Sequence, residues 1–403
     1  MANTVITPSI IAKVALAQLE NNLVFGRSVY RDYDREFNKV GDTISIRRPV
    51  NFTAQDGAVA VTQDVTEGKL SLTLDKRKHV SWLFNTQDLT LSIEKYNERY
   101  IQPALIALAN QIDFDGLQLY KKVWNWVGTP GTTLASYAGF AKAPLRLDEM
   151  AVPQDMRKAV LNPNDKWGLL GSQTSLYVQD AARDAYRRGD LGDIGGIMTS
   201  MDQNMATHTT GAMAGTPLIN GASQNVTYAT SANTESQSLI TDGWTASTTI
   251  LEGDVFTIAG VNAVNPKSKV STGTLQQFVV RSAVTADGSG NATLTISPPI
   301  ITSGAYQTVS AAPADNAAIT VVGSGSTSYR QNLVFHRNAF VLAMRDLEMP
   351  DGAVFKARES ANGFSIRVLK WYDGENDEER IRLDVLYGWK AIYPHLATRL
   401  SGT

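Results

Sequence analysis

Apolar positions near the N-terminus recur at roughly helical spacing: Ile10, Val14, Ala17, Leu19 and Leu23. Thr7-Pro8 precedes them as a helix start signal. The pattern predicts an amphipathic helix that begins near Pro8. The next segment, 28–42, is charged and too polar to lie in a core, so we expect this N-terminal arm to find its partners on other elements or other subunits.

From Thr43 the hydrophobic period changes to two. Isoleucines alternate with polar residues in 43–52, and leucines do the same in 69–75. Two such runs around the segment 53–68 predict a long antiparallel hairpin with a flexible tip. Its loop is longer than compact domains usually contain. Because such a hairpin can bury little by itself, we predict that it lies on a neighbour.

The strongest helical pattern follows, over 93–123. Ser92 is a candidate N-cap, and one apolar stripe contains Ile101, Leu105, Leu108 and Ile112. Pro103 lies inside this span and predicts a bend or a restart. A helix of this length is roughly 45 Å long at ~1.5 Å per residue, which is typical of a spine that crosses a molecule.

The middle of the chain contains shorter patterns. The segment 145–163 mixes helix and strand signals and ends at Asn162-Pro163. The segment 174–188 predicts another helix, and the Gly-rich segment 189–197 predicts a flexible connection behind it.

The composition changes sharply between 220 and 328. This region has only three basic residues and six acidic ones, and roughly three in ten of its residues are Ser or Thr. Short β-type runs are separated by Gly, Asn, Pro and Ser clusters, which predicts a small all-β sandwich or barrel. From Asn332 onward ten basic and ten acidic residues return. We therefore interpret the β region as an insertion into a host domain.

The C-terminal region is rich in strand patterns. Runs at 332–344, 364–373 and 380–394 are predicted strands, with an acidic turn at 374–379. Apolar and charged residues alternate through 380–385, which predicts that the last two runs form a half-buried antiparallel pair.

Composition narrows the function classes. The 403 residues are sufficient for two to three structural units. With 37 basic and 39 acidic residues, the net charge of −2 provides no basic field for nonspecific nucleic-acid binding. The absence of cysteine excludes disulfides, thiolate catalysis and cysteine zinc sites. Signal-peptide features and a run of ~18 to 20 apolar residues are both missing, so we expect a soluble protein, intracellular when made.

Acidic residues give two candidate sites. Asp113 and Asp115 resemble a paired acid site, but helical residues two apart point to different faces, so we favour polar exposure near a helix end. The turn at 373–377 faintly resembles a calcium loop. An EF-hand requires Gly at the sixth position and Glu at the twelfth, where this chain has Glu378 and Asp384. We favour a solvated hairpin turn, and a weak divalent-ion contact stays open.

Other catalytic signatures are absent from the sequence. The segment 189–196 lacks the Lys-Ser/Thr of a phosphate loop, and no G-x-S-x-G occurs. His208 lies in a polar loop with no acidic neighbour nearby in sequence, while His79 and His336 lie in strand-like segments that favour packing or interface roles. We predict no enzymatic activity, no cofactor and no metal site.

The order of these parts resembles the tailed-phage capsid fold (HK-ninety-seven-like), which is shared with the herpesvirus capsid floor. More specifically, the chain is similar to short-tailed-phage coat proteins with an inserted β-barrel domain. The resemblance depends on several segments in fixed order: 1–37, 41–52, 98–113, 332–350, 363–373 and 382–400. It implies an α+β fold with an N-arm, an extended β-hairpin loop, a spine helix, peripheral and axial domains, and an inserted small all-β domain.

The resemblance implies the following division of the chain: N-terminal arm 1–40, extended hairpin 41–82, peripheral domain with spine helix 83–168, first part of the axial domain 169–219, inserted all-β domain 220–328, and a return through the axial and peripheral domains at 329–403. The arm and the hairpin are expected to reach neighbouring subunits. Candidate intersubunit contact residues are Arg31, Arg35, Arg47, Arg48, Phe52, Lys69, Arg77 and Lys78.

The implied function is a structural major capsid protein that self-assembles as pentamers and hexamers into an icosahedral shell around double-stranded DNA, without sequence-specific binding. Expected partners are a scaffolding protein, a portal protein and a possible decoration protein, with assembly in the host bacterial cytoplasm and no membrane association. Because the arm begins at once, a separate scaffolding protein is implied. Some relatives cross-link Lys to Asn, but nothing near Lys69, Lys76 or Lys78 identifies such a pair.

Two alternatives belong to other classes. The Ser/Thr-rich β region leaves open a β-rich carbohydrate-binding or tail-associated virion protein. A hydrolase without a recognisable signature is the second alternative.

Overall fold

The computed structural model describes residues 8–33, 43–54, 56–59, 62–63, 65–85, 100–173, 188–189, 191–353 and 355–402. The chain forms two compact units. Unit 1 contains Met1–Ser45, Ser71–Leu117 and Phe340–Lys390, and unit 2 contains Ile46–Leu70, Gln118–Ala339 and Ala391–Thr403. The boundary between the units crosses both strands of the predicted hairpin, β1 (Thr43–Arg47) and β2 (Lys69–Thr73).

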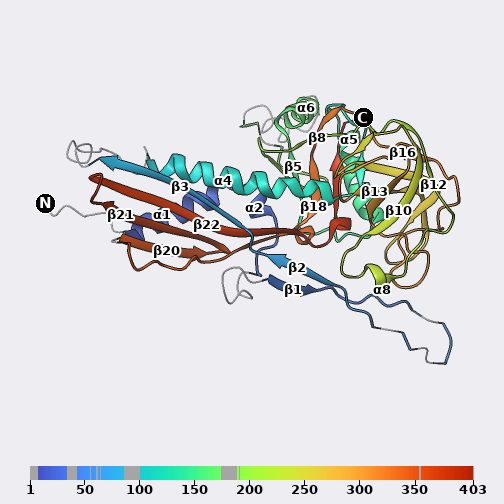
Figure 1. The fold of residues 1–403 in the computed structure, drawn as a ribbon, viewed down its shortest axis with the longest axis horizontal. Helices are drawn as coiled ribbons and strands as arrows, with labels where there is room; N and C mark the ends of the chain where they lie inside the picture. The colour runs from blue at the N-terminus through green and yellow to red at the C-terminus, as the bar shows by residue number, and fades with distance from the viewer. Residues whose placement is uncertain are drawn as a thin grey trace. The chain divides into compact units, whose positions relative to one another are not determined.

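Unit 1 combines helices with an antiparallel sheet (Figure 1). Its sheet order is β19-β22-β21-β20, and β3 pairs with β22. The described elements are α1 (Pro8–Asn22), α2 (Phe25–Ser28), β3 (Lys76–Asn85), α4 (Gln102–Leu117), β19 (Phe340–Met344), β20 (Phe355–Ala361), β21 (Phe364–Asp373) and β22 (Glu378–Ala391).

The predicted N-terminal helix is confirmed as α1, which begins at Pro8. Its apolar side, including Ala12, Ala15 and Leu19, is buried, and the helix packs against α4, β20 and β21. The arm therefore finds partners within its own chain. Ser28 and Val29 are also buried, although we expected the segment 28–42 to be too polar for a core; residues 34–42 lie outside the described part.

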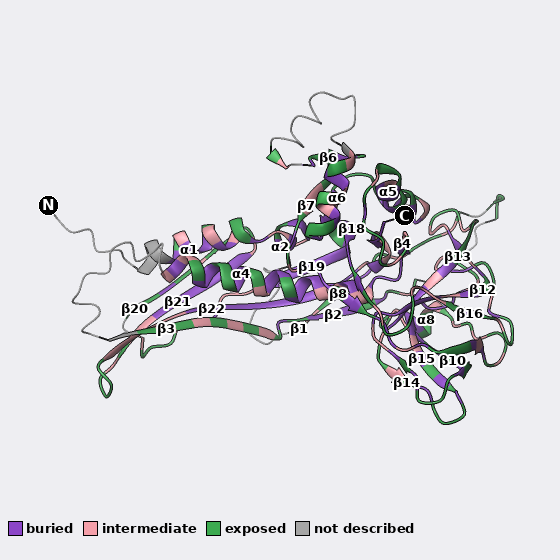
Figure 2. Ribbon diagram, turned by 90° about the horizontal axis from the view of Figure 1, so that it is seen from above, coloured by how far each residue is buried: buried purple, intermediate pink, exposed green. Residues whose placement is uncertain are grey.

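The spine helix is confirmed over α4, and its predicted stripe is buried: Ile101, Leu105, Leu108 and Ile112. Figure 2 shows buried and exposed faces alternating along α4. Of the bend or restart predicted at Pro103, the structure shows no bend inside α4; instead, α4 begins at Gln102, so Pro103 is its second residue, where its missing N–H removes no helical hydrogen bond. With 16 residues, α4 is about 24 Å long. Residues 93–99 lie outside the described part.

The predicted C-terminal strand pair is confirmed, with Arg367 opposite Asp384 in the β21–β22 register. The prediction that this pair is half-buried is wrong, because β22 is buried on both faces from Leu383 to Trp389. Asp384 is fully buried and accepts hydrogen bonds from Arg367 Nη2 at 2.6 Å and Arg382 Nε at 2.7 Å. Paired arginines allow this carboxylate to lie inside the sheet.

Unit 2 contains a six-stranded mixed sheet in the order β4-β23-β18-β5-β7-β6. Asn162 caps α6 by accepting from the Asp165 N–H at 3.0 Å, and Pro163 occupies the first helical position. The elements are η3 (Gln118–Lys122), β4 (Trp126–Val127), α5 (Tyr137–Glu149), β5 (Arg157–Leu161), α6 (Pro163–Gln173), β6 (Asp193–Ile194), β7 (Ile197–Met201), β18 (Leu333–His336), η4 (Arg337–Ala339), η5 (Pro394–Leu396) and β23 (Ala397–Leu400).

The Gly-rich segment is not the flexible connection that we predicted. β6 and β7 form an antiparallel hairpin in which Asp193 pairs with Met198 and Ile194 with Ile197. Gly195 and Gly196 form its turn, with φ of 57° and 75°. Two consecutive positive φ values are typical of the tight two-residue hairpin turn, which favours glycine. The helix predicted over 174–188 lies outside the described residues, apart from Arg188.

The inserted region of unit 2 is a barrel. Six strands pair in the order β16-β12-β13-β15-β10-β9, and the bridge between Leu218 and Ala318 joins the two edges. Its core includes Phe256, Phe278 and Leu294. The elements are β8 (Thr207–Thr209), β9 (Gly215–Ile219), α8 (Tyr228–Ser231), β10 (Gln237–Trp244), β11 (Thr249–Ile250), β12 (Val255–Val264), β13 (Ser271–Val280), β14 (Val284–Thr285), β15 (Ala292–Ser297), β16 (Ile319–Val321) and β17 (Ser328–Arg330).

Three expected boundaries differ from the observed division. The expected peripheral segment, 83–168, is split at Leu117, because its later strands enter the unit 2 sheet. The expected hairpin, 41–82, loses its last part to β3, which pairs with β22. The barrel begins at Gly215 rather than at Asn220, since β9 pairs with β10.

Candidate assembly site

The base of the hairpin loop is fixed inside unit 2 by Arg48. This side chain is buried and forms an ion pair with Glu235 of the inserted barrel. Its Nη2 also donates to the Ile392 carbonyl at 2.8 Å, and its guanidinium lies 5.9 Å from the centre of the Tyr393 ring. A buried, paired arginine at this position holds the first hairpin strand against two other segments of the same unit.

Three further contacts join the hairpin to the barrel. The Asn51 N–H donates to Tyr306 Oη at 3.1 Å, and Tyr306 Oη donates to the Thr66 carbonyl at 3.3 Å. The Lys69 N–H donates to Asn233 Oδ1 at 2.9 Å. We call these contacts, together with those of Gly68 and Tyr228 described next, the hairpin anchor. Its hairpin residues are Arg48, Asn51, Thr66, Gly68 and Lys69, and its barrel residues are Tyr228, Ala232, Asn233, Glu235 and Tyr306.

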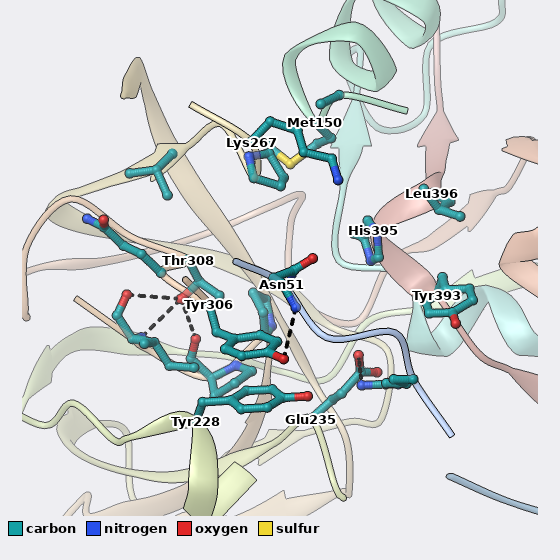
Figure 3. A pocket seen from close by; sticks show the side chains of 18 of the residues that line it. Asn51, Met150, Tyr228, Glu235, Lys267, Tyr306, Thr308, Tyr393, His395 and Leu396 are labelled. Carbon is teal, nitrogen blue, oxygen red and sulfur yellow. Dashed lines mark hydrogen bonds and ion pairs between the residues drawn. The ribbon is translucent and has the colours of Figure 1, made fainter. Parts of the chain in front are cut away.

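Two of these positions require particular residues. A Cβ on Gly68 would lie 2.5 Å from the Ala232 carbonyl oxygen, so only glycine allows the two backbones to come this close. The rings of Tyr228 and Tyr306 stack with centroids 3.4 Å apart (Figure 3). Burial, with Tyr306 as a secondary cause, raises the pKa of Tyr228 to about 12, so its hydroxyl stays protonated.

The loop beyond the anchor presents apolar side chains to solvent. Phe52, Val59 and Val65 are 64%, 81% and 62% exposed. Phe52 lies between two fixed positions, since Asn51 is bonded to Tyr306 and Thr53 is paired with the Gln63 amide across the loop. Large apolar side chains exposed on a loop whose base is fixed are typical of a protein–protein interface.

A cavity of about 550 Å³ lies beside the anchor in unit 2 (Figure 3). Its wall carries Arg48, Lys267, Lys269 and His395, and Glu235 is its acidic residue. Burial, with Arg48 and Lys267 nearby, lowers the pKa of His395 to about 4. Burial and the adjacent Lys267 also lower the pKa of Lys269. His395 is therefore neutral at pH 7.

Acidification is expected to destabilise unit 2 partly through His395. In the unfolded chain its pKa is ~6.5, whereas in the folded unit it is about 4. Because the unfolded chain takes up the proton first, stability is complete above pH ~6.5 and falls as the pH decreases toward 4, by at most ~1.4 kcal/mol per pH unit. In urea unfolding between pH 7 and 4.5, His395→Gln should show a shallower loss of stability than wild type; identical slopes would contradict the assignment.

The structure places the predicted contact residues differently. Phe52 and the exposed Arg47 lie on the hairpin, with Arg47 Nη1 3.4 Å from Glu67. The side chain of Lys69 is exposed as well. Arg48 is occupied within its own chain. Arg77 and Lys78 lie on β3 near Asp384 and Asp115, at 3.8 Å and 4.0 Å, and Arg31 lies over the Phe364 ring. Arg35 lies outside the described residues.

Asp113 and Asp115 are not the exposed pair that we favoured, since both are buried. Asp113 accepts from the backbone N–H groups of Val24, Phe25 and Gly26 at 2.6, 3.2 and 2.8 Å. Asp115 accepts from Tyr387 Oη at 2.8 Å and lies 3.2 Å from Lys76 Nζ. The two carboxylates use separate partners and do not converge, so both are structural.

His208 has an acidic neighbour that its sequence context did not indicate. Its Nε2 lies 3.0 Å from Asp254 Oδ1, and its Nδ1 lies 3.1 Å from Tyr120 Oη. Burial is the main cause that lowers the pKa of His208. The guanidinium of the fully buried Arg399 lies 5.2 Å from the Tyr120 ring centre. This is a buried polar network between the barrel and the six-stranded mixed sheet of unit 2.

The acidic turn is a hairpin turn in which Asp373 accepts from the Glu375 N–H and from Asn376 Nδ2 at 3.1 and 3.0 Å. No cluster of three His, Asp or Glu residues suited to a metal ion occurs among the residues described. None of the described helices has the length and apolar character needed to cross a lipid bilayer.

A family model that matches almost the whole chain defines its class: this chain is a tailed-phage major capsid protein, whose copies assemble into the shell of the virion. The chain belongs to the P22 coat protein family, because the family model described as "P22 coat protein - gene protein 5" matches residues 1–402. The family implies a structural, non-enzymatic role.

The relatives compared with this chain share a small part of its sequence. The chain is 22% identical over 420 residues to the major capsid protein of Acyrthosiphon pisum secondary endosymbiont phage 1, covering 98% of this chain and 97% of that protein. A solved structure from Mycobacterium phage Che8 has the same fold, with a TM-score of 0.50, 13% identity, and coverage of 94% of this chain and 92% of that chain. The solved CUS-3 coat protein I-domain is 30% identical over 27% of this chain and 96% of that chain, with a TM-score of 0.20.

Proposed function

We propose that this capsid protein assembles as pentamers and hexamers, with a separate scaffolding protein, into an icosahedral shell that encloses double-stranded DNA. Assembly takes place in the host bacterial cytoplasm, and the shell includes a portal protein and can carry a decoration protein. The nearly balanced charge supports the enclosing role, since a strongly basic subunit would retain the DNA that a phage must release.

The observation that carries the assembly mechanism is the exposure of apolar side chains on the anchored hairpin. Phe52, Val59 and Val65 have no cover within the described residues, although the hairpin base is fixed. We infer that a neighbouring subunit covers them. Arg47 and Lys69 flank this group, and with Arg77, Lys78, Arg31 and Arg35 they stay predicted intersubunit contacts. Many such contacts of modest strength, closed by symmetry, stabilise a shell without covalent bonds.

Replacing Phe52 with serine is expected to abolish shell formation while leaving the subunit folded. An aromatic anchor at an interface contributes ~2 kcal/mol or more, so each contact should weaken roughly 30-fold. The measurement is negative-stain electron microscopy and sedimentation of the chain expressed with a candidate scaffolding protein. Phe52→Leu is the matched control, because it keeps an apolar side chain and should still assemble.

Two outcomes would contradict this mechanism. Normal shells from Phe52→Ser would show that the exposed group is not an assembly contact. Normal shells from the wild-type chain expressed without any scaffolding protein would contradict the requirement for a scaffold, and leave the hairpin mechanism standing.

A further inference from the structure

The hairpin loop is held by the inserted barrel of its own subunit, on both of its strands. We propose that the barrel acts as an intrasubunit clamp, which fixes the direction of the hairpin before any neighbouring subunit binds. This role differs from that of a surface decoration or a general stabiliser of the fold. It assigns the insertion a specific task in assembly.

The Tyr306 hydroxyl is the centre of the clamp. It accepts a hydrogen bond from the Asn51 N–H on the outgoing strand and donates one to the Thr66 carbonyl on the returning strand. One atom of the barrel therefore ties the two strands of the hairpin together. Its ring is fixed by stacking on Tyr228, which lies in α8 of the barrel (Figure 3). The stacked ring fixes the position of this hydroxyl within the barrel.

The base of the hairpin is bound at two more points. On the returning strand, the Lys69 N–H donates to Asn233 Oδ1, and Gly68 packs directly against the Ala232 carbonyl. On the outgoing strand, buried Arg48 pairs with Glu235. Ala232, Asn233 and Glu235 follow α8 within four residues of its end. A single short segment of the barrel therefore contacts both strands, which fixes their direction as well as their position.

A buried ion pair adds little net stability of its own. Moving both charges out of water costs about as much as their attraction returns. Arg48, however, satisfies only one arrangement, because its Nη2 also bonds to the Ile392 carbonyl. A hairpin in another direction would separate Arg48 both from the half-buried Glu235 and from the Ile392 carbonyl.

The consequence concerns entropy. A loop that becomes ordered only when it meets its partner loses conformational entropy, which makes association weaker. A loop that is already ordered in the free subunit does not lose that entropy on binding. Because Asn51 is fixed by Tyr306 and Thr53 by Gln63, Phe52 is presented in one place in the free subunit. The clamp thus holds the hairpin loop as a contact surface that is formed before a neighbouring subunit binds.

Hydrogen–deuterium exchange of the purified, unassembled full-length subunit tests the clamp directly. In wild type, peptides covering 46–70 are expected to exchange at least tenfold more slowly than an unstructured peptide. Tyr306→Phe removes the bridging hydroxyl and should accelerate exchange at Asn51 and Thr53 by about tenfold or more, while peptides from β12 and β13 keep their protection. Tyr372→Phe is the matched control, because it removes an exposed tyrosine hydroxyl bonded to Asp377.

Several outcomes decide the proposal. Unprotected hairpin peptides in the wild-type subunit, or unchanged exchange in Tyr306→Phe, would overturn it. Asn233→Ala acts on the other strand, so faster exchange at Lys69 in that variant supports the clamp even if Tyr306→Phe fails to fold. In assembly with scaffolding protein, Tyr306→Phe should be at least several-fold slower than Tyr372→Phe. Equal assembly rates with a released hairpin would refute the link to assembly, and leave the shell function itself untouched.

Discussion

Asp113→Ala is expected to destabilise unit 1 by on the order of 3 to 5 kcal/mol. The wild-type carboxylate accepts from three consecutive backbone N–H groups at the start of α2, between Val24 and Gly26. Val24 occupies the cap position of α2 without a capping side chain, so Asp113 of α4 acts as the cap from a different helix. Alanine leaves these donors buried without an acceptor. The measurement is the midpoint of urea unfolding of the unassembled subunit.

Asp113→Asn separates hydrogen bonding from simple loss of charge. An asparagine keeps one acceptor oxygen and is a good capping residue, so it should cost less than half as much as alanine. Hydrogen exchange should localise the damage to peptides of α1, α2 and α4. If Asp113→Ala unfolds at the wild-type urea concentration, the carboxylate does not hold the N-terminal segment, and its burial has another cause.

Asp254→Ala is expected to produce a loss of similar size in unit 2, roughly 3 to 5 kcal/mol. Asp254 is 1% exposed and accepts from the Leu251 N–H at 2.7 Å, the Gly211 N–H at 3.1 Å and His208. Its removal leaves two backbone donors and the His208 ring without a partner. It also removes an attractive charge near the buried guanidinium of Arg399.

The matched control for Asp254 is an exposed carboxylate of the same barrel. Asp287 accepts from the Ser289 and Asn291 N–H groups at 2.8 Å, but it lies in an exposed turn. Asp287→Ala should therefore cost well under half as much as Asp254→Ala, because water can replace the carboxylate. Equal losses for the two variants would show that the buried network around His208 does not stabilise the junction between the barrel and the mixed sheet.

Contacts between distant segments of the same chain order both the N-terminal region and the hairpin base. Asp113 and the hairpin anchor both join segments far apart along the chain, with Tyr306 contacting residues 240 and 255 positions away. We had expected the hairpin to lie on a neighbour, and the arm to find its partners on other elements or other subunits. In the structure, α1 and the hairpin base have partners in their own chain, whereas Phe52, Val59 and Val65 of the loop are exposed.

Local patterns in the sequence determined the regular elements. The periodicities of 3.6 and 2 gave α1, α4 and the strands of the hairpin and of the β21–β22 pair, because one buried face imposes its spacing on neighbouring residues. The loss of charge between 220 and 328 identified the inserted barrel, since a small closed sheet needs apolar inner faces and short polar turns. The order of these parts was sufficient to suggest the capsid fold.

Only the tertiary structure decided what the polar residues do. Asp113, Asp254 and Arg48 have no local signature, because their partners are backbone groups or charges contributed by distant segments. A carboxylate that will be buried and one that will be solvated are identical in sequence, and the difference in free energy arises when folding removes water from one of them. The docking of the hairpin on its own barrel is likewise a matter of long-range contacts, which no spacing of residues along the chain encodes.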